Sequence, residues 1–410
     1  MLNLQGDNKN LLKLIIRILL VVCVMIGCFI LGNISTKFGL IIGNEKERYI
    51  ISEAREYSEF DTLFEARKKI DQLYDGEIDS NDLVTGAIKG MVQSLDDPYS
   101  AYMTNDEYKK YLRSTSGEFI GIGVNISQTD KGILVVGLIP GGGAEEAGIE
   151  PGDIIKVVDG QIIEKDMDKA VSLLTGEEEK KLKVTVTRDG KDINYDVQRR
   201  KVITESVDSE MLEGNIGYLR LKNFESHSAE QFNTNVNNLR DKGMKGLILD
   251  LRENGGGYVA QAVDIASRFI PKDKVITYTL DKYNYKKEYK SKGEDLIDVP
   301  VIILIDEGTA SASEILTGAL KDYDLVTTVG VTSFGKGIVQ LPFVLPSKNG
   351  ALKLTVSKYY SPSGENIHKK GIEPDYKVEI PDSVLKQQYS KDIDTQYQKA
   401  LELMKEKIGA

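Results

Sequence analysis

The sequence predicts an α/β protein of several parts: an N-terminal transmembrane helix, a small helical unit, a β-rich domain with two helices, and an α/β core. Three observations carry this prediction. An apolar stretch lies near the start of the chain, short alternating strand patterns fill residues 116–200, and strand and helix patterns alternate from about 205 to 380. We expect the boundaries to fall at residues 1–44, 45–115, 116–200, 201–382 and 383–410.

Length and composition exclude several classes of protein. The 410 residues suffice for two or three domains with buried cores. The 53 basic and 63 acidic residues give a net charge of −10 without basic runs, so nucleic acid is not an expected partner. The two histidines, His227 and His368, are far apart, and both cysteines, Cys23 and Cys28, lie in the apolar stretch. We therefore expect no metal site, no cofactor and no cysteine nucleophile.

The apolar stretch covers residues 14–32, interrupted only by Arg17, and is about one bilayer thick if the Arg17 side chain reaches the interface. Basic residues precede it, which places the N-terminus in the cytoplasm and residues from about 45 onward outside. We expect a single-pass protein of the cell membrane with an extracytoplasmic main part. A cleaved signal peptide is one alternative, and a lipoprotein is another, because Gly27-Cys28 resembles a lipobox.

Charged segments with helical patterns lie on both sides of the β-rich and α/β parts. Residues 45–115 space their apolar residues at helical intervals, and about 383–408 is predicted as one short charged helix. These two segments could hold a homodimer, and the sequence leaves that question open. The apolar residues that define the first pattern are Ile70, Leu73, Leu83, Ile88 and Met91.

A glycine-rich loop opens the β-rich part, and a second matched run follows it. The loop is Gly121-Ile122-Gly123-Val124, and the run AEEAGIEPGDIIKVVDG covers residues 144–160. Alone, the first motif would mark an ordinary hairpin. Together the two resemble a PDZ domain, which implies that residues 121–124 bind a terminal carboxylate through backbone amides while a peptide tail joins a sheet edge.

Three segments of the α/β core place small or polar residues directly after apolar strands, where a site is expected. They are DLRENGGG (250–257), DEGTASASEI (306–315) and TSFGKGIVQ (332–340). In the second, strand VPVIILID leads into a helix whose N-terminus carries Ser311. Backbone amides and the helix dipole there can stabilise an oxyanion, although a serine at this position is more often a simple N-cap.

A serine needs a base, and the scarcity of histidine leaves lysine as the candidate. Lys336 fits because Phe334, Ile338 and Val339 surround it with apolar side chains, which would lower the pKa of its ammonium toward the working pH. Gly335 and Gly337 allow close packing around it. Most lysines are solvated surface groups, so this assignment depends on its combination with Ser311.

The combined motifs resemble the C-terminal processing peptidases, a family of tail-specific serine proteases that carry PDZ domains. The resemblance rests on TASASEI with Ser311, on FGKGIVQ with Lys336 and Gln340, on DLRENGGG, and on the runs SLDDPYSAYM (94–103) and YYSPSGENIHKKGIEPD (359–375). It implies a core that resembles the ClpP/crotonase-like sandwich. It also implies substrates that are proteins with exposed C-termini.

The resemblance also implies the roles of site residues. Ser311 would be the nucleophile, Lys336 the general base, and Gln340 the group that orients the lysine. The last role is possible if residues 336–340 form one strand, because positions 336 and 340 would then share a face. The oxyanion hole would use the amide of Ala312 and one from the glycine turn, with Gly257 preferred to Gly256.

The remaining polar residues near these motifs receive structural roles. We expect Asp250, Arg252 and Asn254 to hold the loop, and Glu314 to support the helix start. A non-catalytic, membrane-tethered PDZ scaffold and a hydrolase of small esters or lipids are the alternatives from other classes.

Overall fold

The computed structural model describes residues 60–176, 179–346 and 350–409. The chain divides into two compact units, one up to Val84 and one from Thr85 onward, and each is described by itself. The predicted membrane anchor at residues 14–32 lies outside the described residues. Among the residues that are described, no helix is both long and apolar enough to cross a membrane.

The described part of the first unit is helical. It contains α3, Asp61–Leu73, and the start of α4, Ser80–Gln93. Helix α3 has no buried residue, and Leu73 is 75% exposed. The apolar spacing that predicts α3 therefore does not bury its side chains.

The segment that follows α4 departs from the predicted helical unit. It forms a strand, β1 (Ala101–Met103), before the helix α5 (Asn105–Ser116). Strand β1 pairs antiparallel with β19 (Ala351–Tyr360), with Ala101 opposite Lys353. The unit that we expect to be helical at 45–115 therefore also contains a strand, because residues 101–103 pair with a sheet of the core. Helix α5 is fixed by a capping box between Thr104 and Glu107.

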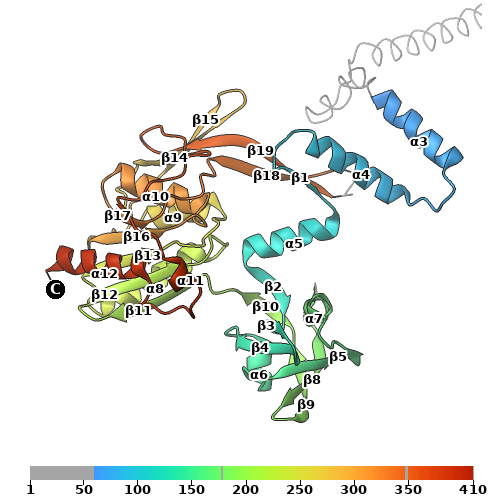
Figure 1. Cartoon of the computed structure of the whole chain (residues 1–410), viewed down its shortest axis with the longest axis horizontal. Helices are drawn as coiled ribbons and strands as arrows, with labels where there is room; N and C mark the ends of the chain where they lie inside the picture. Colours follow the sequence, from blue (N-terminus) through green and yellow to red (C-terminus); the bar gives the residue numbers. More distant parts are fainter. Residues whose placement is uncertain (1–59, 177–178, 347–349, 410) are drawn as a thin grey trace, which may run out of the picture. The chain divides into compact units, whose positions relative to one another are not determined.

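The β-rich part has the two predicted helices, α6 (Gly143–Ala147) and α7 (Met167–Leu174). Its main sheet has the order β3-β4-β5-β8-β9 (Figure 1), so β3 is an edge strand. The inner face of this sheet buries Ile133, Val135 and Val186. A small second sheet has the order β10-β2-β7. The strands are β2 Glu118–Gly121, β3 Val124–Thr129, β4 Gly132–Leu138, β5 Ile154–Val158, β6 Gln161–Ile162, β7 Thr175–Gly176, β8 Lys181–Arg188, β9 Lys191–Gln198 and β10 Arg200–Ile203.

The α/β core is built on a six-stranded sheet of order β11-β12-β13-β16-β17-β20, in which only the β11–β12 pair is antiparallel. Alternate residues of its strands enter two separate cores. Leu249 and Ile303 pack with α8, α9 and α10, whereas Ile248 and Ile302 pack with α12. The elements are β11 Val207–Leu212, β12 Ile216–Leu221, α8 Ser228–Asp241, β13 Gly246–Asp250, α9 Val259–Ala266, β16 Val301–Ile305, α10 Ala312–Asp322, β17 Thr327–Gly330 and β20 Tyr376–Lys377.

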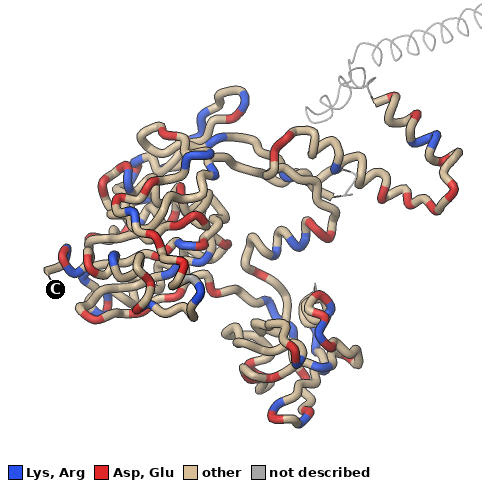
Figure 2. The backbone as a smooth tube through the Cα atoms, in the orientation of Figure 1, with Lys and Arg blue, Asp and Glu red and all other residues tan. Residues whose placement is uncertain are grey.

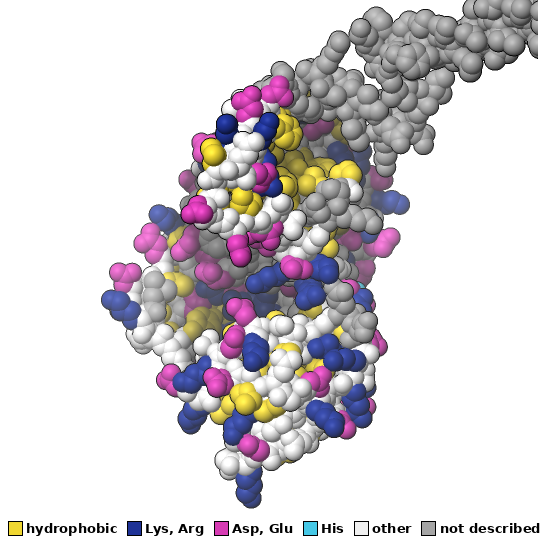
Figure 3. Space-filling model, turned by 90° about the vertical axis from the view of Figure 1, so that its right-hand side faces the viewer, with side chains coloured by type: hydrophobic (Ala, Val, Ile, Leu, Met, Phe, Trp, Pro, Cys, Tyr) yellow, Lys and Arg dark blue, Asp and Glu magenta, His cyan; other side chains and the backbone are white. Residues whose placement is uncertain are grey.

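A second, antiparallel sheet of the core has β19 at its centre. Strands β1, β14 (Val275–Asp281) and β18 (Ile338–Val344) all pair with β19, and β15 (Lys286–Lys290) pairs with β14 (Figure 1). This sheet carries the segment that follows Lys336. Acidic and basic residues are interspersed along the chain (Figure 2) and over the face drawn in Figure 3.

The single C-terminal helix predicted at 383–408 is wrong. Two helices, α11 (Asp382–Leu385) and α12 (Thr395–Ile408), lie there instead. Asp394 is the N-cap of α12, and its carboxylate accepts hydrogen bonds from the amides of Gln396 and Tyr397. An aspartate in this position starts a new helix, so the charged pattern does not run on as one.

Candidate active site

Ser311 lies at the sharp turn between β16 and α10, as the apolar strand and the small residues after it predict. It is the N-cap of α10, with φ 57° and ψ −111°. A positive φ is uncommon for a residue with a side chain and costs free energy, so the surrounding structure must hold it. Ala310 and Ala312 are buried on either side, whereas Ser311 is half-buried and faces a cleft of about 530 Å³.

The walls of this cleft bring most of the predicted catalytic residues together. Ser311, Lys336, Gln340, Gly256 and Gly257 all line it, although they come from three segments of the chain. Concave sites with a few convergent polar groups are the usual places for binding and catalysis. Ala312 lies directly behind Ser311 at the start of α10.

Lys336 is half-buried in the loop that precedes β18. Burial lowers the pKa of its ammonium, Lys353 lowers it further, and Glu314 opposes them. Its Nζ lies 5.3 Å from the centroid of the Tyr99 ring. In the part of the chain that the structure describes, this ammonium has no hydrogen bond or ion pair, and none joins it to Ser311.

The apolar surroundings of Lys336 differ in part from those expected. Ile338 is buried, but Phe334 is 53% exposed. The ring of Tyr99, far away in sequence, lies near the amine instead. The expected close packing at the glycines is present, since a Cβ on Gly337 would lie 2.6 Å from the His368 amide nitrogen.

Gln340 does not orient Lys336 in this structure. Its Nε2 donates a hydrogen bond to Thr355 Oγ1 at 3.2 Å. The strand expected over 336–340 begins only at Ile338, and the pairing with β19 shifts between Val339 and Gln340. The alternation that would place positions 336 and 340 on one face is therefore absent.

The glycine turn lies against the nucleophile segment. A Cβ on Gly256 would be 2.8 Å from both the Ala312 amide nitrogen and the Ser311 Cβ. The Gly256 amide already donates to Asn254 Oδ1 at 2.9 Å. Within the described residues, the amides of Gly257 and Ala312 have no acceptor, so these two are the better pair to receive an oxyanion.

The role of Glu314 is larger than the sequence predicts, because the carboxylate does more than support the helix start. Its Oε2 accepts from the amides of Ser311 and Lys336, and its Oε1 accepts from Ser333 Oγ and the Gly335 amide. The signal for this role is the Ser-x-x-Glu spacing of a capping box. Nothing in that spacing predicts the hydrogen bonds of Glu314 to residues 333–336.

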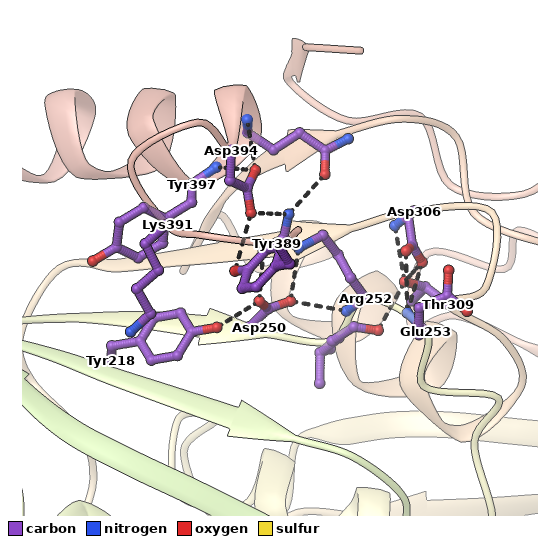
Figure 4. A network of polar contacts seen from close by, with 12 residues as sticks. Tyr218, Asp250, Arg252, Glu253, Asp306, Thr309, Tyr389, Lys391, Asp394 and Tyr397 are labelled. Atoms are coloured by element: carbon purple, nitrogen blue, oxygen red, sulfur yellow. Dashed lines mark hydrogen bonds and ion pairs between the residues drawn. The ribbon is translucent and has the colours of Figure 1, made fainter. Parts of the chain in front are cut away.

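The DLRENGGG loop is held by a buried polar network (Figure 4). Arg252 pairs with Asp250 and with Asp394, each at 2.7 Å, and Tyr218 donates to Asp250. Burial disfavours the charged guanidinium, but Asp250 and Asp394 outweigh it and raise the pKa of Arg252. As expected, Asp250 and Arg252 hold the loop. Asn254 does so as well, because its Nδ2 donates a hydrogen bond to the carbonyl oxygen of Leu221 at the end of β12.

The predicted carboxylate loop lies at the start of the edge strand β3. Ile122, Gly123 and Val124 line a second cleft of about 630 Å³ together with Val171 and Leu174 of α7, whereas Gly121 ends β2. Gly123 has φ 79°, and a Cβ there would lie 2.6 Å from Gly142 Cα. An open strand edge beside a helix suits the addition of a peptide strand.

Comparisons with known proteins agree with this arrangement. Residues 215–378 match Peptidase family S41, residues 121–198 match the PDZ domain, and residues 42–107 match the N-terminal domain of the activating protease CtpB. The chain is 39% identical to the carboxy-terminal processing protease CtpA of Bacillus subtilis over 378 residues, which is 91% of this chain and 78% of the relative.

One further relative supports the same assignment, and one solved structure shows the same fold. A probable CtpA-like serine protease of Staphylococcus haemolyticus is 35% identical over 355 residues, covering 84% of this chain and 71% of the relative. A putative S41 protease from Bacteroides fragilis has the same fold, with a TM-score of 0.51 and 19% identity over 81% of this chain and 92% of its own. The resemblance predicted from the motifs is confirmed: the chain belongs to peptidase family S41, the C-terminal processing serine proteases, and carries a PDZ domain.

Proposed function

We propose that the protein is a serine endopeptidase in which Ser311 is the nucleophile and Lys336 the general base. One observation carries this proposal: both side chains line one cleft, with the serine at a helix N-terminus beside two amides that lack acceptors among the described residues. Serine catalysis needs a base and an oxyanion site within reach of the hydroxyl. The family accounts for the protease class, and these residues account for its chemistry.

The chemistry follows from the protonation state of Lys336. The neutral amine takes the proton of Ser311 as the Oγ attacks the peptide carbonyl carbon. The amides of Ala312 and Gly257 hold the resulting oxyanion, and each such donor is typically worth about 3 kcal/mol. The amine then protonates the leaving nitrogen, and the acyl-enzyme is hydrolysed by water that the same amine deprotonates.

The proposed reaction needs two contacts that substrate binding must form, one between Lys336 and Ser311 and one between Gln340 and Lys336. Lys336 has to move from the Tyr99 ring toward Ser311. Gln340 can orient the amine only if its carboxamide leaves Thr355. Catalytic hydrogen bonds often form fully only in the substrate complex.

The PDZ domain would select the substrates by their C-terminal tails. A tail would add to the edge of β3, with its carboxylate held by amides of residues 121–124 and its apolar side chains against α7. This peptide-binding part disfavours a hydrolase of small esters or lipids. Amidation of a substrate's C-terminus should slow its cleavage, and equal rates would remove the claim that tails are read.

The location is proposed from the sequence alone. The apolar residues 14–32 would tether the protein to the cell membrane, with the catalytic part outside the cytoplasm. The full chain should remain in the membrane fraction after a carbonate wash, and release by the wash would contradict the proposed tether.

The oligomeric state is tested separately. Sedimentation equilibrium of the full chain in detergent would decide between a monomer and a homodimer through the terminal helical segments.

The catalytic proposal is tested with the full chain, an unfolded protein substrate, and mass spectrometry of the new termini. Ser311→Ala should abolish cleavage and keep the fold. Lys336→Arg should do the same, because a guanidinium stays charged and cannot act as a base. Comparable cleavage by either variant would overturn the assignment of the catalytic residues, whereas a wild-type chain that binds peptide tails but cuts no substrate would favour a non-catalytic PDZ scaffold.

A further inference from the structure

A second lysine, Lys353, lines the same cleft as Ser311 and Lys336. It lies on β19, the central strand of its sheet, opposite Ala101 on β1 and Pro342 on β18. Residues two apart on a strand share a face, so Lys353 projects on the same side as Thr355, the partner of Gln340. The antiparallel sheet therefore fixes the backbone of Lys353 at the wall of the cleft, which its side chain lines.

The charge of Lys353 has no counterion among the described residues. Its Nζ lies 5.7 Å from the centroid of the Tyr111 ring, and within the same part of the chain it forms no ion pair. Among the residues described as lining the cleft, the one carboxylate is that of Glu225. That carboxylate accepts hydrogen bonds from the hydroxyls of Thr204 and Ser206.

The described lining of the cleft therefore carries two lysines against one carboxylate, in a protein of net charge −10. When Lys336 is neutral, as in the proposed reaction, Lys353 is the one cation of the described lining, and the one carboxylate there, that of Glu225, is engaged by two hydroxyls. A cation in a concave, partly dehydrated site attracts anions more strongly than the same cation on an open surface. The cleft is where a peptide must lie to be cut, and the anions of a peptide are carboxylates.

We propose that Lys353 is a specificity-determining residue that pairs with the carboxylate of an aspartate or glutamate close to the scissile bond of the substrate. This inference rests on the proposed function, because it takes the cleft as the place of cleavage. The position of the acidic residue relative to the bond is the quantity that the experiment measures. A free C-terminal carboxylate in the cleft is the other source of the same chemistry.

The test uses a peptide that the full-length enzyme cuts at one bond, identified by mass spectrometry. Each of the three residues on either side of the bond is replaced by Glu, Gln or Lys, and every peptide is made with a free and an amidated C-terminus. Ratios of kcat/KM at one pH are compared, so any change in the Lys336 base cancels. The enzymes are the wild type, Lys353→Met, Lys353→Arg, Lys353→Glu and a control, Lys358→Met, which removes an exposed lysine from the same strand.

The wild type should prefer Glu to Gln by about fivefold at one or more positions, which is the scale of a partly exposed ion pair, and the preference should fall with added salt. Lys353→Arg and Lys358→Met should keep it, Lys353→Met should lose it, and Lys353→Glu should prefer Lys. Equal ratios in the wild type and Lys353→Met at every position would overturn the proposal.

Two other outcomes are distinguishable. If amidation lowers kcat/KM in the wild type but not in Lys353→Met, while Glu and Gln peptides are cut equally, the carboxylate belongs to the chain end and the side-chain claim is overturned. If cleavage depends on Ser311 but shows no charge preference, only this inference fails. If Ser311→Ala cuts the peptides as fast as the wild type, the proposed function fails first.

Discussion

One oxygen of Glu314, Oε2, accepts hydrogen bonds from the backbone amides of both Ser311 and Lys336, at 2.8 and 2.9 Å. The Glu314 side chain is 1% exposed. Hydrogen bonds to a charged acceptor are roughly twice as strong as neutral ones, and burial strengthens them. The positions of the proposed nucleophile and of the segment that carries its base are thus set by one buried carboxylate.

Glu314→Gln should lower kcat by about 100-fold, because an NH₂ group replaces one acceptor oxygen and faces amide donors, and displacements of about 1 Å can cost that much. The free energy of unfolding should fall by roughly 2 kcal/mol. Kinetics with a peptide substrate and urea unfolding check both. Glu307→Gln, at an exposed position of the same turn, is the matched control. An unchanged kcat in Glu314→Gln would show that the bridge does not position the catalytic groups.

Gly257→Ala should strongly impair catalysis. Gly257 has φ 147°, and a Cβ there would lie 2.3 Å from Phe224 O, so the turn must shift and the amide proposed for the oxyanion hole moves with it. Loss of one such donor typically lowers kcat by about 10²–10³-fold. Gly255→Ala is the control, because a Cβ at Gly255 would have no other atom within 4 Å and the φ of this residue is not positive. Equal activity of the two variants would contradict this role of Gly257.

The sequence predicts the parts of the fold that depend on local pattern. VPVIILID contains the strand β16, Ser311 is the N-cap of the helix after it, and the two helices of the β-rich part are present. Each of these follows from apolar periodicity and from residues that start or end an element. The position of the glycine turn beside Ser311 has a similar basis, because loops that follow adjacent parallel strands meet at one edge of a sheet.

Contacts between distant segments could not be predicted in this way. Tyr99 beside Lys336 and Lys353 on the cleft wall depend on the pairing of β1 with β19, two strands about 250 residues apart in the sequence. No local periodicity encodes that pairing. For the same reason the spacing from Lys336 to Gln340 is misleading, since the strand start and the register shift are set by the partner strand.

Asp394→Ala should destabilise the core by roughly 3–5 kcal/mol, because it leaves the buried Arg252 guanidinium with one carboxylate in place of two and removes the N-cap of α12. Urea unfolding measures the loss. The control is Glu402→Ala, which breaks an exposed pair with Lys399 on the same helix and should change stability by less than about 1 kcal/mol. Similar losses in the two variants would mean that the buried network adds nothing beyond a surface pair.

The pH dependence of kcat/KM should report the pKa of Lys336 in the free enzyme. A general base acts when it is neutral, so the rate should rise with pH and level off above this pKa, which burial and Lys353 place below the ordinary value of 10.5. Lys353→Met removes one of the causes that lower the pKa, so the rising limb should move to higher pH. Lys353→Arg keeps the positive charge and should leave the limb in place, as should Lys358→Met.

Glu314 acts on the same limb in the opposite direction. Its carboxylate raises the pKa of Lys336, so Glu314→Gln should move the limb to lower pH. A limb that stays fixed in both Lys353→Met and Glu314→Gln would mean that it reports a group other than Lys336.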